Sequence, residues 1–305
     1  MVASVGYYTS RYSGEEIDRR LGEIVCPNLL DNAYFVGGGS QKGYGVLPVN
    51  QRCLTSYSSE TIGADRWACS GMMALLPEGV QFTNVLHQKM GPNIISFLNG
   101  KTLTFTALMS DGSLKTGTKT FEGYESQDIV FYNDGAIQLM WWLHGGKCWG
   151  IFNRTGEGKT IAAAKLEVGD TQTLAKQNSN GMWEILDIPN FESELLKCQR
   201  CFCKSFPLTV PPTTSYANQI YASTSTVRNN GRLSVDFPVE MIAAPTVERI
   251  GTAYCYAALN DGTEGTTYDS YIVPMSANTR GFFINQSFYN GFATLGLCWT
   301  ASTEY

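Results

Sequence analysis

The sequence predicts a mainly β protein in which a helix connects two β-units. The composition is the first indication: 16% of the 305 residues are charged, against about 25% in typical domains. The second is the abundance of Gly and Tyr, with 31 and 16 copies, which is typical of strands linked by many turns. The third is the recurrence of short apolar runs that alternate with period two. A chain of this length is expected to form more than one domain.

The first expected element is a short helix within residues 1–26. Ser13 is a suitable N-cap, and Ile17, Leu21 and Ile24 follow at helical spacing. Such a short helix is marginal alone and needs a surface to pack against. Packing on its own domain and packing against other chains in a neck both meet this need, and we favour the neck.

Residues 27–190 are predicted to form a β-sandwich of the jelly-roll type. Its opening strand is expected at 27–35 and its closing strand at 161–169, and these two strands must meet to complete the fold. Further strands are expected at 102–107, 128–133, 137–143 and 147–152.

Alternation within these strands predicts which side chains face the core. At 102–107 the inward residues are Leu103, Phe105 and Ala107. In the closing strand they are Ala162, Ala164, Leu166 and Val168. Trp67 is expected to anchor the core, with Asp65 and Arg66 paired beside it.

Residues 191–203 are expected to form the connecting helix, with Leu195, Cys198 and Phe202 on its apolar side. The prolines that follow stop both helix and central strand, so residues 204–305 are expected to form a smaller C-terminal β-sandwich.

Two stretches of this second unit stand out. Apolar side chains alternate at 293–299, near the end of the chain, and predict an apolar strand. Such a strand should be central or covered at an interface. Residues 257–269 are expected to form a long polar loop. This loop would be either a receptor contact or a tolerated insertion, and both explanations stay open.

The nine cysteines are odd in number and irregular in spacing, which favours reduced, buried thiols over a disulfide framework. Cys198, Cys201 and Cys203 suggest zinc as an alternative, because thiolates at this spacing can share a metal. No second pair of this kind exists in the sequence, and its two histidines lie far away. We therefore favour buried apolar thiols.

The strand that contains Trp141 and Trp142 carries the strongest signal of a binding surface. Consecutive strand residues point to opposite faces, so Trp141 is expected in the core and Trp142 outside, beside Gln138 and His144. An outward indole flanked by hydrogen-bonding groups suits a sugar ring. The alternative is that a loop, a sheet or another subunit covers Trp142. Three further aromatic residues, Tyr124, Trp149 and Trp183, are candidates to extend the surface, although the sequence does not place them.

Five short motifs follow one another along the chain: Asn28–Asn32, Pro48–Arg52, Ala64–Trp67, Ala164–Gly169 and Cys198–Phe202. Their order resembles that in tail-fibre or receptor-binding proteins of tailed bacteriophages and prophages. The Asn-Leu-Leu start and Leu-Glu-x-Gly finish of the first unit also resemble jelly-roll carbohydrate-binding modules.

This resemblance implies a homotrimer in the virion tail that contacts other tail or baseplate proteins and binds bacterial surface polysaccharide. Within that trimer, residues 1–26 would form the neck where the chains meet, and the C-terminal β-sandwich (204–305) would be the receptor-binding tip. It also implies a possible structural calcium where the opening and closing strands meet, with Asp31 and Glu167 as the candidate ligands. No other cofactor is expected.

Several functions are not expected. The net charge of −5 gives no basic field for nucleic acid, and no apolar run reaches the ~20 residues of a membrane-spanning helix. The N-terminus lacks the pattern of a signal peptide, so synthesis and assembly in the bacterial host cytoplasm are expected. An enzyme is not expected either, because the acidic residues form no recognisable catalytic pair. A glycan depolymerase or esterase and a purely structural virion protein remain the alternatives.

Overall fold

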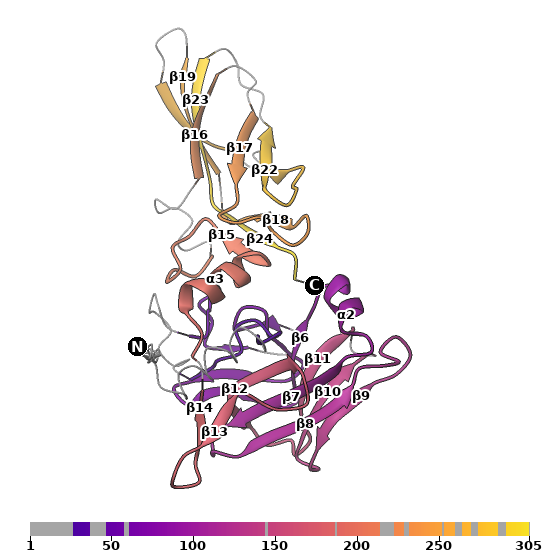
Figure 1. Cartoon of the computed structure of the whole chain (residues 1–305). Coiled ribbons are helices and arrows are strands. Elements are labelled where there is room, and N and C mark those ends of the chain that lie inside the picture. The colour runs from indigo at the N-terminus through magenta and orange to yellow at the C-terminus, as the bar shows by residue number, and fades with distance from the viewer. Residues whose placement is uncertain are drawn as a thin grey trace, which may run out of the picture.

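The computed structural model describes residues 27–36, 47–57, 61–143, 146–186, 188–213, 223–228, 232–251, 253–259, 264–269, 274–285 and 291–304. The prediction of a mainly β protein is confirmed, since antiparallel strands dominate and the described residues include only helices α2 (Pro92–Leu98) and α3 (Phe191–Gln199). The expected helix within 1–26 lies outside the described residues. The two β-units follow one another along the length of the molecule (Figure 1).

The first unit contains two six-stranded antiparallel sheets. The first sheet has the order β1 (Ser56–Tyr57), β4 (Met73–Leu76), β5 (Gly79–Phe82), β12 (Lys159–Val168), β7 (Thr102–Met109) and β8 (Leu114–Thr120). The second has the order β2 (Thr61–Ile62), β3 (Ala68–Cys69), β6 (Val85–Lys89), β11 (Cys148–Asn153), β10 (Ile137–Trp142) and β9 (Ile129–Asn133). A small hairpin of β13 (Ala175–Gln177) and β14 (Trp183–Ile185) accompanies them.

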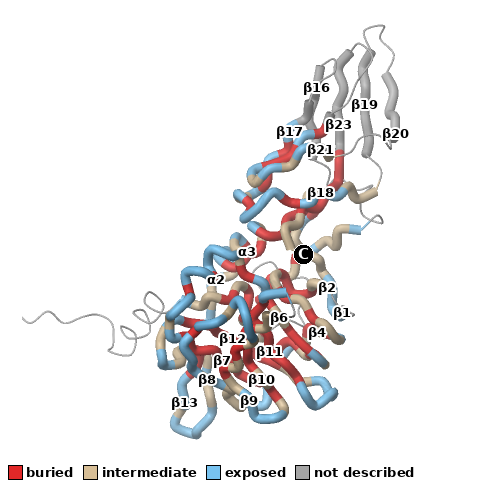
Figure 2. Tube along the Cα trace, turned by 90° about the vertical axis from the view of Figure 1, so that its right-hand side faces the viewer, coloured by how far each residue is buried: buried red, intermediate tan, exposed pale blue. Residues whose placement is uncertain are grey.

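The two sheets share one hydrophobic core, which makes the first unit sandwich-like (Figure 2). The ring of Phe105 on the first sheet lies 6.0 Å from that of Trp149 on the second, centroid to centroid. The predicted inward residues Leu103, Phe105 and Ala107 are fully buried, and so is Trp67. Burying a large apolar side chain contributes about 1.5–3 kcal/mol, so this cluster supplies much of the folding free energy. Whether the connections follow the jelly-roll pattern stays a prediction.

The expected meeting of the opening and closing strands is present, although the opening segment is irregular. Backbone amides of Leu29 and Phe35 donate to Leu166 O and Ala162 O of β12, each at 2.8 Å. The Asn28 side chain extends this pairing by accepting from Leu166 N and donating to a second β12 carbonyl. Strand β5 pairs with β12 up to Ile161, and the opening segment pairs with the same edge of β12 beyond that residue.

A β-bulge changes the expected facing of the closing strand. The register of β12 against β7 shifts between Ile161 and Ala163, because a bulge inserts one extra residue. Ala164 and Leu166 face the main core as expected, but Ala162 belongs to a separate small cluster and Val168 is 36% exposed. The prediction for Ala162 and Val168 was therefore wrong.

The connecting helix is shorter than expected. Asn190 caps α3 by accepting from Ser193 N, and the helix ends at Gln199. Strand β15 (Phe202–Lys204) follows, so Phe202 lies in a strand and not on the helix. The strand preference of the aromatic Phe202 and of Cys203 outweighs the helical spacing that suggested a longer helix.

The second unit is divided into three small antiparallel sheets. They are β15 with β24 (Trp299–Ser302) and β18 (Thr246–Arg249); β16 (Ser223–Arg228) with β23 (Gly291–Leu297), β19 (Ala253–Leu259) and β20 (Glu264–Asp269); and β17 (Arg232–Asp236) with β22 (Gly281–Asn285) and β21 (Pro274–Met275). Leu297 and Trp299 are buried in its core, and β23 and β24 each lie between two neighbours, as the apolar terminal strand required.

The long polar loop expected at 257–269 is a hairpin instead. Strands β19 and β20 pair from Ala253 opposite Asp269 to Ala258 opposite Glu264, and the turn between them lies outside the described residues. The Thr-Thr-Tyr run of β20 has a high strand preference, which outweighed the Gly and Asp residues around it.

Charged side chains join the two units at a junction where the end of the chain returns to the first unit (Figure 1). Arg52 binds both Asp65 and Glu304, and Arg66 binds Asp31 and Glu304. The expected Asp65–Arg66 pair was thus wrong. Each residue instead pairs with a partner that sequence proximity could not indicate.

Candidate functional site

The side chains of β10, β11 and β6 that point away from the main core form one aligned surface. The strand register sets two rows across the three strands: one holds Gln138, Phe152 and Val85, and the next holds Met140, Gly150 and His87. Trp142 follows in the third row. We call these seven residues the Trp142 face.

Aromatic rings gather around Gly150, which has no side chain to separate them. A Cβ at Gly150 would lie 2.6 Å from the Phe152 ring, so that ring leans over the glycine. The Trp142 indole meets Phe152 edge-on at 5.1 Å and His87 at 6.2 Å between centroids. Edge-to-face contacts of this kind are favourable for aromatic pairs and fix the orientation of the indole.

The face is apolar at its centre and polar at its margin. Val85, Met140 and Phe152 are almost fully buried by their neighbours, whereas Trp142 is half-buried. Arg154 lies over the Phe152 ring at 4.6 Å and donates through Nε to Gln138 Oε1 at 3.1 Å. A sugar ring could therefore reach one indole and, beside it, a Gln–Arg pair, which offers stacking and hydrogen bonds over a small area.

Of the predicted carbohydrate ligands that lie among the described residues, the structure brings together two, Gln138 and Trp142. Trp149 is fully buried in the main core, so its proposed role as an extension of the surface was wrong. Tyr124 stacks on Phe121 at the edge of that core, 5.2 Å between centroids, and it contacts Trp141 rather than Trp142. His144 lies outside the described residues.

Sequence reasoning missed Phe152, His87 and Arg154. His87 and Arg154 come from segments that were not linked to the Trp142 strand, and Phe152 ended a strand whose register was unknown. Side chains two apart in a strand share a face, so alternation alone puts Phe152 on the same face as Cys148. This was the only feature of the sequence that indicated where Phe152 lies.

The two calcium candidates do not form a common site. The Asp31 carboxylate is bound by Arg66 Nε at 3.2 Å. The Glu167 carboxylate is fully buried, accepts from Thr173 N at 2.8 Å and pairs with Lys165 at 3.2 Å. A calcium ion would need several oxygen ligands together, and the described residues contain no group of three or more potential metal ligands.

The thiols of Cys198, Cys201 and Cys203 are buried and belong to different environments. Burial raises the pKa of Cys201 to about 11 and that of Cys203 to about 12, so both are protonated at neutral pH. Cys198 packs in a cluster with Leu47, Val49 and Leu195, whereas Cys203 packs in the core of the second unit, as the interpretation of apolar packing residues requires.

No protein-family model, curated protein or solved structure matches this chain, so its function is argued from its own residues. Neither helix of the described part has the length and apolar character needed to cross a membrane.

Proposed function

We propose that this protein recognises carbohydrate without chemical catalysis, as a tail-fibre or receptor-binding protein of the bacteriophage type. The observation that supports this proposal is the half-buried indole of Trp142. Phe152 and His87 hold it edge-on on the outside of the second sheet. A stacking ring fixed in this way loses little conformational entropy when a sugar binds.

The ligand in this proposal is a bacterial surface polysaccharide. The apolar face of a hexose would cover the exposed part of Trp142, and its hydroxyls would exchange hydrogen bonds with Gln138 and Arg154. Because the accessible area is small, each site is weak. A trimer that displays three sites would raise the avidity about 10²–10⁴-fold.

The test is a glycan array probed with the purified chain, with its mass in solution measured on the same sample. Trp142→Ala is expected to weaken binding at least about tenfold, because one indole provides most of the contact. Phe97→Ala is the matched control, since Phe97 is a 65% exposed aromatic residue on α2 and is not one of the seven residues of the Trp142 face.

Three results would contradict the proposal. Equal binding by the wild type and Trp142→Ala would place the site elsewhere. Release of reducing sugar from the bound polysaccharide would favour a depolymerase. Absence of binding to any glycan by a correctly folded trimer would favour a purely structural virion protein.

A further inference from the structure

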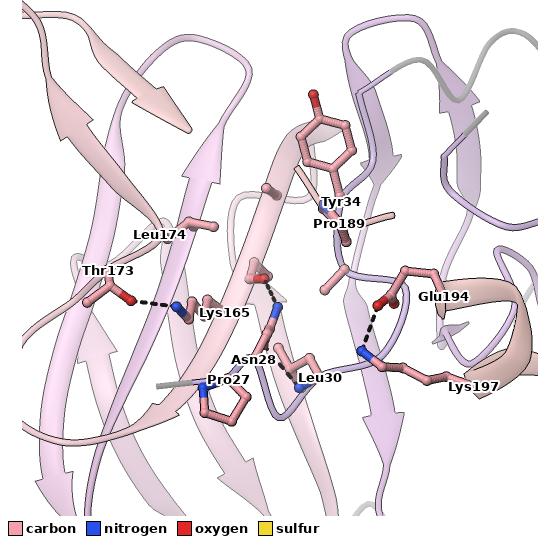
Figure 3. A pocket seen from close by; sticks show the side chains of 13 residues that line it. Pro27, Asn28, Leu30, Tyr34, Lys165, Thr173, Leu174, Pro189, Glu194 and Lys197 are labelled. Atoms are coloured by element: carbon pink, nitrogen blue, oxygen red, sulfur yellow. Dashed lines mark hydrogen bonds and ion pairs between the residues drawn. The ribbon is translucent and has the colours of Figure 1, made fainter. Parts of the chain in front are cut away.

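A pocket of about 190 Å³ opens where the opening segment lies along β12, next to the start of α3 (Figure 3). We call it the seam pocket. Its walls include the apolar side chains Pro27, Leu30, Leu174 and Pro189. A recess of this size, open to solvent on one side, can hold a small ligand such as one monosaccharide unit.

One side of the pocket is formed by Lys165, whose ammonium points toward Thr173 (Figure 3). The same ammonium lies 3.2 Å from the buried carboxylate of Glu167. Glu167 also accepts from Thr173 N and Thr173 Oγ1, so its oxygens are already well supplied with donors. Lys165 is thereby held in place by two acceptors, which among the described residues leaves one of its three N–H groups for a ligand.

The opposite side is formed by Lys197 on α3, whose ammonium lies 2.6 Å from Glu194 Oε1 (Figure 3). The other oxygen of Glu194 accepts from Asn32 N at 2.5 Å. The Lys197 side chain is 43% exposed, and this single ion pair uses only one of its three N–H groups.

Tyr34 also lines the pocket, with its hydroxyl directed away from Lys165 and Lys197 (Figure 3). Burial raises the pKa of the Tyr34 hydroxyl, so it stays protonated at neutral pH. The Asn28 side-chain amide, in contrast, forms hydrogen bonds with the backbone of β12 and of its own segment. Asn28 therefore joins the opening segment to β12 and does not serve a ligand. The lining residues thus include two ammonium groups against one carboxylate, that of Glu194, which leaves a surplus of charged donors between apolar walls.

We infer that the seam pocket binds a single sugar unit that carries a carboxylate, such as a hexuronate. Its carboxylate accepts from Lys197, a ring hydroxyl accepts from Lys165 on the opposite side, and its ring packs against the proline and leucine walls. The choice of a sugar rests on the proposed carbohydrate-recognition function, whereas the need for an acidic group follows from the surplus of donors.

The experiment titrates the full chain with galacturonate and with galactose, followed by saturation-transfer NMR of the ligand. Galacturonate is expected to bind at least about tenfold more tightly than galactose, because a carboxylate forms charge-assisted hydrogen bonds. Lys197→Ala is expected to weaken galacturonate binding about tenfold. The matched control is Lys119→Ala, since Lys119 is an exposed lysine on β8, and it should bind as the wild type does.

The two proposals fail separately. Galacturonate binding should persist in Trp142→Ala, because that face belongs to the second sheet and the seam pocket to the first. Equal affinity for the two sugars, or equal binding by the Lys197→Ala and Lys119→Ala variants, would overturn the seam pocket alone. Galacturonate binding that is lost in Trp142→Ala would move the acidic sugar to the Trp142 face and would also overturn it.

Discussion

Arg52 and Glu304 lie 252 positions apart in the chain, and their side chains meet at 2.6 Å. The Glu304 carboxylate is only 4% exposed and also accepts from Arg66 N at 3.0 Å. Donors of the first unit thus hold the Glu304 carboxylate, and they attach the end of the second unit to the first unit. Because the pair is shielded from solvent, removing one partner leaves an uncompensated charge.

Glu304→Gln is expected to lower the free energy of unfolding by about 2 kcal/mol, because it removes a charge-assisted bond from two buried arginine contacts. Urea unfolding measures this change. Glu240→Gln serves as the control, since Glu240 pairs with Arg280 at 3.7 Å with both side chains largely exposed, and such pairs contribute little. Equal effects of the two substitutions would show that the junction is not held by Glu304.

The Asp65 carboxyl gives the junction a dependence on pH. Burial raises its pKa to about 6, an effect that Glu304 reinforces and Arg52 opposes without cancelling. In the unfolded chain its pKa is about 4. The folded state therefore binds this proton more tightly, and the free energy of unfolding falls as pH rises from about 4 to about 6.

Asp65→Asn is expected to remove this dependence, because an amide can still accept from Arg52 but does not titrate. Between pH 4 and pH 7 the wild type should lose on the order of 2 kcal/mol of stability relative to the variant. Urea unfolding at several pH values measures the difference. If the wild type instead gained on the variant as pH rose, attraction to Arg52 would outweigh burial.

Local patterns predicted the core well because alternation is a property of each strand alone. Leu103 and Phe105 needed no knowledge of their neighbours to be placed inside. The two consecutive tryptophans were also assigned correctly to opposite sides, since Trp141 is fully buried and Trp142 is not.

Features set by pairing between distant segments could not be predicted. The bulge that turns Ala162 out of the main core depends on how β12 meets both β5 and β7. The rows of the Trp142 face depend on the registers of three strands. The same holds for the two ion pairs that Glu304 forms with Arg52 and Arg66, whose partners come from opposite ends of the chain.

Trp141 and Trp142 should differ strongly in their effect on stability. Trp141→Ala removes a fully buried indole and its 2.9 Å bond to Tyr124 O, so a loss of about 3–5 kcal/mol is expected. Trp142→Ala should cost about 1 kcal/mol or less, since its indole is partly solvated and the neighbouring rings can adjust. Thermal unfolding of both variants measures the contrast. Similar losses would mean that Trp142 is a core residue and unavailable to a ligand.

Gly79 controls the approach of β5 to the bulged end of β12. Its φ is +144°, and a Cβ there would lie 2.0 Å from Ile161 O. Gly79→Ala therefore has to separate the strands, at an expected cost of about 3 kcal/mol or more from backbone strain and overpacking. Gly100→Ala is the control. Gly100 also has a positive φ, +74°, but a Cβ added there would meet no other part of the structure within 4 Å. The control should cost only about 1 kcal/mol.

Gly79→Ala also tests how the seam pocket is built. The backbone of Ile161 precedes the bulge, and Ala163, Ala164 and Lys165 of the pocket wall follow it. A displaced Ile161 carbonyl should therefore move the pocket wall while leaving the Trp142 face on the other sheet in place. Galacturonate binding is expected to weaken in Gly79→Ala at temperatures where the variant is folded, and glycan binding through Trp142 is expected to persist. If both activities declined together, the two sheets would not act as independent supports for the two sites.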